Sequence, residues 1–261
     1  MTSAAQPVAR PRRRGRVLRR VAVVLVVLLV LLGIGAVVAD GALRSYAEDR
    51  VAEDIESQLP EGVEGNVDVT IGGASMILQY LSESFERVDL VGRGLTVNGT
   101  PLDADIRATG VPADRTKPVE RAVGRFGIDE AAVTELLDAS TDAPADVALT
   151  RGAVEYSAPV RLLGIELTYD VTAEPRIDGD TVIFTPTGAA LSAGSRSFDV
   201  GNLLGGERLA SLAFPVCAAQ YLPEGARLTD LDLEPGRATA TVEAESLQLS
   251  GDALSTVGSC G

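Results

Sequence analysis

Two acidic pairs are the residues of this chain whose type and spacing come nearest to a chemical site. Asp103 with Asp105, and Asp230 with Asp232, have the Asp-x-Asp form with which nucleotide-sugar enzymes hold a divalent cation through carboxylate oxygens. Both pairs lie in stretches of alternating polar and apolar residues, and residues i and i+2 of a strand face the same side. We therefore interpret both pairs as wet faces of strands and expect no metal site.

The composition excludes most catalytic machinery. The 261 residues include no His and a single Lys, Lys117, so histidine-based triads, dyads and His-ligated metals have no residues to build them. The sequence also lacks a P-loop and the Gly-x-Gly-x-x-Gly and Gly-x-Ser-x-Gly motifs. We expect no enzyme activity and no cofactor. A glycoside hydrolase that uses two carboxylates is a disfavoured alternative.

A basic stretch, Arg115, Lys117, Arg121 and Arg125, interrupts an otherwise acidic region. Arg121 and Arg125 are one helical turn apart and could bind a phosphate or an anionic lipid head group. A solvated surface segment is the alternative interpretation. Residues 40–261 carry 16 basic and 37 acidic groups, a net charge of −21, so nucleic acid is not expected as a partner.

Cys217 and Cys260 are the two cysteines of the chain. In an oxidising compartment an even number of cysteines favours a disulfide. Two separate buried thiols are the alternative, and a catalytic cysteine is disfavoured because carboxylates would be its only bases. We predict a bridge that links the penultimate residue to the body of the domain.

Residues 21–39 form an uncharged apolar run that follows seven arginines. At about 1.5 Å of rise per residue the run is roughly 28 Å of helix, close to the thickness of a hydrocarbon core. Because residues 1–39 contain no acid, the positive-inside rule places residues 1–20 in the cytoplasm and the rest of the chain outside. We expect a retained single-pass anchor over 21–39, and a signal peptide cleaved after Ala39 is the alternative. The arginines are Arg10, Arg12, Arg13, Arg14, Arg16, Arg19 and Arg20.

The remainder is expected to form an amphipathic connecting helix, residues 40–59, and one exported domain, residues 60–261. Asp40 and Gly41 are expected to break the connecting helix from the anchor and so to provide a hinge.

Alternation of apolar and polar residues predicts an α+β domain made mostly of antiparallel strands. Asn98-Gly99 is typical of a tight hairpin turn. The segment SMILQYL, residues 75–81, predicts a helix without a clean polar face, which is either fully buried or lines an apolar cavity. Further helices are expected at 128–137 and 202–212, and strands at 67–71, 85–92, 94–97, 100–111, 152–158, 165–177, 181–186 and, as a hairpin, 228–249.

Four of these segments carry a family resemblance. VDVTIGGASMILQYL, FERVDLVG, LDADIRATGVP and IDEAAVTELL resemble the LmeA-like phospholipid-binding family of actinobacterial envelope proteins. The pattern is a strand, Gly-Gly, an apolar helix with Gln79 and a meander, without a catalytic signature. The chain differs from the expected family pattern at residues 74–76, Ala-Ser-Met, where a Pro-Phe pair would follow Gly-Gly.

The resemblance implies a curled antiparallel sheet wrapped around helices, with an apolar groove like that of tubular lipid-binding proteins. It implies a membrane-tethered phospholipid-binding protein of the cell envelope that supports lipid or lipoglycan assembly. An envelope scaffold that contacts proteins and binds no ligand is the main alternative. The densest aliphatic positions on the two short helices are the predicted lipid contacts: Met76, Ile77, Leu78, Leu81, Val133, Leu136 and Leu137.

Overall fold

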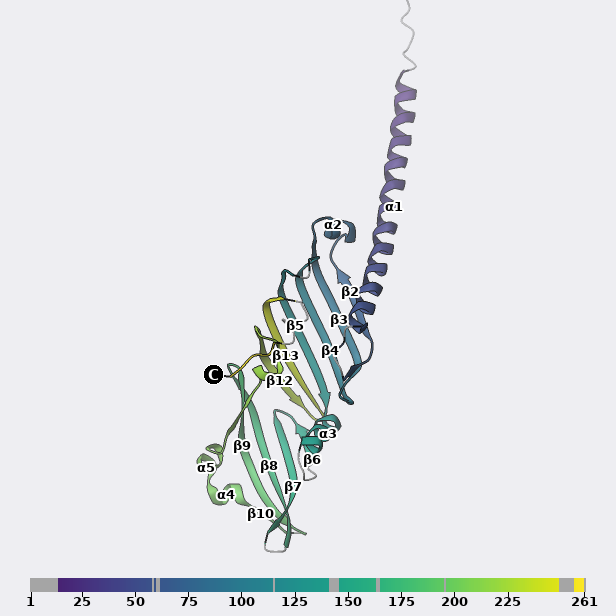
Figure 1. Ribbon diagram of the computed structural model, residues 1–261. Coiled ribbons are helices and arrows are strands. Elements are labelled where there is room, and N and C mark those ends of the chain that lie inside the picture. Colours follow the sequence, from purple (N-terminus) through teal and green to yellow (C-terminus); the bar gives the residue numbers. More distant parts are fainter. Residues whose placement is uncertain are drawn as a thin grey trace, which may run out of the picture.

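One helix extends far out of a two-sheet body (Figure 1). The computed structural model describes residues 14–57, 59, 62–114, 116–140, 146–162, 165–194, 196–248 and 256–260, with the backbone alone at 14–24, 136–140, 162, 165 and 204. Helix α1, Arg14–Ser57, is 44 residues long. Its segment from Leu25 is long and apolar enough to cross a membrane.

Sheet A, the seven-stranded sheet next to α1, is antiparallel throughout. Its order is β1-β3-β4-β5-β13-β12, and β2 pairs with the same edge of β3 as β1 does. The turn at Asn98 and Gly99 has positive φ at both residues, as a primed two-residue hairpin requires. The strands are β1 (Val63–Glu64), β2 (Val67–Gly72), β3 (Ser84–Val97), β4 (Thr100–Pro112), β5 (Pro118–Asp129), β12 (Ala226–Glu234) and β13 (Arg237–Gln248).

Sheet B continues the body away from α1 (Figure 1) and is also antiparallel. Its order is β10-β9-β8-β7-β6, and β11 pairs with the first residues of β9. The strands are β6 (Asp146–Thr150), β7 (Ala153–Leu162), β8 (Ile165–Asp178), β9 (Thr181–Ala193), β10 (Arg196–Asp199) and β11 (Phe214–Cys217).

Short helices lie at the ends and edges of the sheets rather than inside them (Figure 1). They are α2 (Met76–Leu81), α3 (Glu130–Ser140), α4 (Val200–Leu204), α5 (Gly206–Ala210) and the 3-10 turn η1 (Ala219–Tyr221). The predicted α+β class, with antiparallel sheets and one long apolar N-terminal helix, is confirmed. Among the described strands, neither sheet closes on itself.

The two sheets are joined by a small core. Val147 and Leu149 of β6 are buried against Leu233 of β12, with β7 side chains packed around them. Backbone hydrogen bonds link the same hairpins, from Gly152 N–H to the Leu233 carbonyl and from Gly236 N–H to the Leu149 carbonyl. The joint is therefore made of both packing and backbone pairing.

The predicted hinge at Asp40 and Gly41 is wrong, because α1 runs through both residues without a break. An Asp side chain can interrupt a helix by bonding the backbone of its own segment, but the Asp40 carboxylate bonds another segment instead. It accepts hydrogen bonds from Ser75 Oγ (2.7 Å) and from Ile77 N–H (3.0 Å) at the start of α2. A single interior glycine costs a helix only about 1 kcal/mol, which these contacts can offset.

The C-terminal half of α1 is fastened along the outer edge of β2. Glu48 accepts the Ile71 N–H at 2.7 Å, and Glu56 accepts the Val67 N–H at 3.0 Å. Eight helical residues rise about 12 Å and four strand residues about 13 Å, so the two spacings match. The helix thereby satisfies backbone donors that an edge strand would otherwise leave unpaired.

Candidate functional site

Sheet A has one apolar face, which the strand register defines. Residues paired directly across strands face the same side. One row across the sheet is Val69, Leu90, Ile106, Gly124, Val242 and Leu228. The next row is Val67, Gly92, Ala104, Phe126, Ala240 and Leu231.

Sheet B has an apolar face of the same kind. Tyr156 of β7 pairs with Val147 and Val171, and Val171 pairs with Ala189. A second row is Ala158, Tyr169, Leu191 and Phe198, and the pair Val160 and Leu167 follows it on the same face. A third is Pro175, Phe184 and Phe214, in which the last two rings stack with centroids 5.3 Å apart.

The two apolar faces meet and are incompletely covered. Leu231 and Leu233 of sheet A pack against Val147 and Tyr156 of sheet B in the core that joins the sheets. Away from the joint most members are only half-buried, including Leu90, Ile106, Phe126, Leu228, Leu167, Tyr169 and Leu191. Phe198 is 59% exposed. We call this surface, formed by the rows above, the apolar strip.

The opposite face of sheet A is polar and held by ion pairs. Arg237 reaches Asp103 at 2.7 Å and Asp129 at 2.9 Å, and Asp103 also accepts the Gly94 N–H. The Arg237 hydrogen bond, followed by that of Gly94, lowers the pKa of the Asp103 carboxyl below its ordinary value. Asp103 is thus a structural partner of an arginine. The described residues contain no group of three acidic or cysteine side chains suited to a metal.

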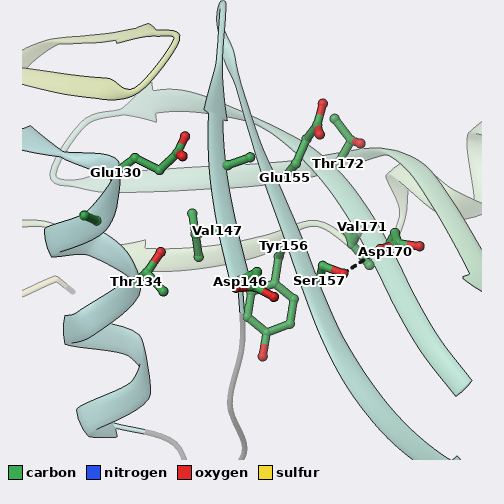
Figure 2. A pocket seen from close by; sticks show the side chains of 12 residues that line it. Glu130, Thr134, Asp146, Val147, Glu155, Tyr156, Ser157, Asp170, Val171 and Thr172 are labelled. Carbon is green, nitrogen blue, oxygen red and sulfur yellow. Dashed lines mark hydrogen bonds between the residues drawn. The ribbon is translucent and has the colours of Figure 1, made fainter. Parts of the chain in front are cut away.

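A pocket of about 620 Å³ lies between α3 and strands β6 to β8, and the strip residues Val147, Tyr156 and Val171 form part of its lining (Figure 2). Figure 2 shows Glu130 and Thr134 of α3 on one side and strand residues on the other. Two of its carboxylates have structural partners: Glu130 accepts the Leu149 N–H at 2.6 Å, and Asp170 accepts the hydroxyls of Ser157 and Ser192. The lining thus combines residues of the apolar strip with carboxylates and hydroxyls, which suits an acyl chain less well than the strip alone.

The predicted lipid contacts fall into two groups that the structure does not bring together. Those on α2 lie at one end of sheet A and Val133 on α3 at the other (Figure 1). The 12 residues of β5 between the two ends span roughly 36 Å. Their part in lipid binding stays a prediction.

Within α2, Met76 is buried and Ile77 half-buried, whereas Leu78 and Leu81 are 66% and 72% exposed. Val133 packs against the core that joins the sheets. Leu136 and Leu137 belong to α3, but their side chains lie outside the described residues.

The predicted head-group pair is on a strand rather than a helix. Arg121 and Arg125 both lie in β5, on the polar face opposite the apolar strip. Arg121 forms an ion pair with Glu243 at 2.6 Å. Their spacing matched a helical turn, but it also places two residues on one face of a strand. Head-group binding by this pair stays a prediction.

The predicted disulfide is confirmed: Cys217 and Cys260 are bonded. It ties the C-terminal residues to β11, and Pro223 forms an isolated bridge with Val257 beside it.

The sequence was compared with known protein families, curated proteins and solved structures. The model of the LmeA-like phospholipid-binding family matches residues 38–243. The chain belongs to this family. No curated protein and no solved structure matches the chain significantly.

For a member of a phospholipid-binding family, the apolar strip is the surface whose chemistry suits acyl chains. The resemblance implied an apolar groove, but the residue patterns did not identify these strand residues, because alternation shows which residues share a face and not whether another layer covers that face. The available signal was the small number of amphipathic helices, too few to cover two sheets.

Proposed function

We propose that this member of the LmeA-like family is a membrane-anchored phospholipid-binding protein that holds acyl chains on the apolar strip. The observation that supports this proposal is the run of half-buried aliphatic and aromatic residues that continues from sheet A to sheet B. A water-exposed apolar surface of this extent is typical of an interaction site.

The strip would replace the bilayer as the solvent for an acyl chain. At about 0.8 kcal/mol per methylene, exposing a chain of about 16 carbons to water costs about 12 kcal/mol, so partial shielding favours extraction strongly. Aliphatic side chains provide this shielding without directional bonds. We propose the chemistry of binding only and no covalent step.

The positive-inside rule supports a cytoplasmic N-terminus and an extracytoplasmic domain. The uncharged length of α1 supports a retained anchor, with the body at residues 60–261 outside the membrane. A role in envelope lipid or lipoglycan assembly is part of this proposal and rests on the family resemblance.

The test compares glutamate substitutions on the two faces of each sheet. Leu167→Glu and Ala240→Glu place a charge on the apolar strip, while Thr168→Glu and Thr241→Glu place it on the opposite face one residue away. All four sites are half-buried, so the substitutions are matched in exposure.

Native mass spectrometry of the full chain released from membranes measures copurifying phospholipid. We expect the first two variants to lose most of it and the two controls to keep it. Equal retention by all four variants would exclude the apolar strip as the site. Absence of phospholipid from the unaltered chain would favour the ligand-free scaffold.

A further inference from the structure

Helix α2 presents an apolar surface that nothing in the described structure covers. Its six residues, MILQYL, carry no charge, and Leu78, Tyr80 and Leu81 are 66%, 66% and 72% exposed. Three large apolar side chains exposed on so short a helix need a partner.

This surface is rigidly held rather than loosely attached. The Gln79 side chain is 4% exposed, donates to the Gly72 carbonyl at 3.1 Å and accepts the Glu86 N–H at 2.8 Å. Met76 is buried beneath the helix. The inward side of α2 therefore fixes it to β2 and β3, so the outward side chains have a defined direction.

The position of α2 relative to α1 indicates what covers the exposed side chains of α2. Asp40 is the first charged residue after the apolar run 21–39, and it bonds the Ile77 N–H and Ser75 Oγ. Arg44, one turn later, donates to the Gly73 carbonyl at 2.9 Å. The first turn of α2 therefore lies level with the residue at which α1 leaves the hydrocarbon.

The continuity of α1 makes this placement fixed. No bend separates the apolar run from the part bound to β2, so α2 cannot swing away from the membrane while β2 stays paired (Figure 1). Tyr46 on α1 and Tyr80 on α2 are both about two-thirds exposed, and tyrosine is enriched at the membrane interface.

We infer that α2 is a second membrane contact, whose Leu78, Tyr80 and Leu81 insert into the interface of the bilayer that holds α1. The inference rests on the membrane anchoring in the proposed function. It assigns to Leu78 and Leu81 contact with the bilayer itself rather than with a lipid held on the apolar strip. The exposed side chains of α2 thus contact the lipid head-group region on the face of the bilayer where α1 emerges at Asp40.

The test uses the full chain in phosphatidylcholine–phosphatidylglycerol nanodiscs. Because the two native cysteines are bonded to each other, Leu81→Cys can be labelled alone with the environment-sensitive dye NBD. Leu203→Cys on α4 is the matched control, since Leu203 is 83% exposed and lies at the far end of the body (Figure 1).

We expect blue-shifted NBD emission at position 81 and at least twofold quenching by lipids brominated in the acyl chain, with neither effect at position 203. Equal emission and equal quenching at the two positions would overturn the inference. Native mass spectrometry of the full chain released from membranes, as in the test of the proposed function, separates the two proposals. Quenching at 81 without copurifying lipid contradicts only the lipid-binding function, and copurifying lipid without quenching contradicts only the membrane contact.

Discussion

Three acidic side chains on one helix show how single residues fasten the anchor to the domain. Asp40, Glu48 and Glu56 follow one another at intervals of eight, and each accepts a backbone N–H from the β2–α2 segment. Hydrogen bonds to a charged acceptor contribute roughly 1.5 to 3 kcal/mol. In the sequence Glu48 and Glu56 looked like the polar side of an amphipathic helix, and Asp40 looked like a break in it.

Replacing Glu48 tests whether this fastening stabilises the domain. Glu48→Ala leaves the Ile71 N–H without its acceptor, and an unsatisfied part-buried donor costs about 1 to 3 kcal/mol. We expect a loss of that size in denaturant unfolding and faster amide exchange at Ile71. Glu53→Ala is the control, because Glu53 forms an exposed ion pair with Arg50, and it should change stability by less than about 0.5 kcal/mol.

Asp40 predicts the pH dependence of the α1–α2 contact. The Ile77 N–H, then the Ser75 hydroxyl and the Met76 N–H, hold the pKa of this carboxyl below its ordinary value of 3.8. A lowered pKa means that the contact is complete above the ordinary value and is lost as the pH falls through the lowered one.

We therefore expect exchange protection of the Ile77 amide, relative to its intrinsic rate, to stay constant near neutral pH and to fall only below about pH 4. Asp40→Asn keeps an acceptor oxygen but no charge, so its protection should be weaker and independent of pH. Loss of protection at about pH 5 to 7 would contradict this account, because the carboxyl of Asp40 would then titrate above its ordinary pKa.

At the scale of elements, local sequence patterns predicted most strands. They failed where contacts with residues distant in the sequence determine the secondary structure. The expected strands at 67–71 and 100–111 correspond closely to β2 and β4. The predicted helix 202–212 is two short helices, because Gly205 has φ of 80° between them.

Strand β5 and the course of α1 were predicted less well. The arginines of β5 suggested a helical turn, although strand pairing on both sides determines its structure. Asp40 and Gly41 suggested a break because the residues that bond Asp40 lie 35 and 37 positions away. The apolar strip was missed for a related reason, since coverage of a face depends on how many helices pack on it.

Continuity of α1 predicts that Gly41 is dispensable. A Cβ at Gly41 would meet no atom within 4 Å, so Gly41→Ala should raise stability by up to about 1 kcal/mol. Phospholipid copurification should not change, and a clear loss would show that flexibility at Gly41 matters. Gly73→Ala is the contrasting variant: Gly73 has φ of 107° and its Cβ would lie 2.7 Å from Gln79, so it should destabilise by roughly 1 to 3 kcal/mol.

At the scale of the whole molecule, a small buried core supports a large open surface. The disulfide compensates for the small core, because it fixes the C-terminal segment to β11, which pairs with the start of β9. Closing a loop of 43 residues stabilises by about 4 kcal/mol in the chain-entropy model. We expect the double variant Cys217→Ser with Cys260→Ser to melt roughly 8 to 16 °C lower. A reducing agent should lower the melting temperature of the unaltered chain equally and leave the double variant unchanged.

The open form of the apolar strip predicts weak selection by acyl-chain length. A closed cavity ends at a wall and rejects longer chains, whereas unclosed sheets with half-buried side chains allow a chain to extend. Each added methylene gains about the same shielding on the strip as it loses in the bilayer, so the net difference between chain lengths nearly cancels.

In competition, the full chain receives an equimolar mixture of phosphatidylglycerols with acyl chains of about 14, 16 and 18 carbons. We expect native mass spectrometry to find occupancies within a factor of about 3 of one another, equivalent to less than about 0.7 kcal/mol. A tenfold preference for one length requires about 1.4 kcal/mol of discrimination. That result would mean that the lipid lies in a bounded cavity, and that the open sheet faces are not its binding surface.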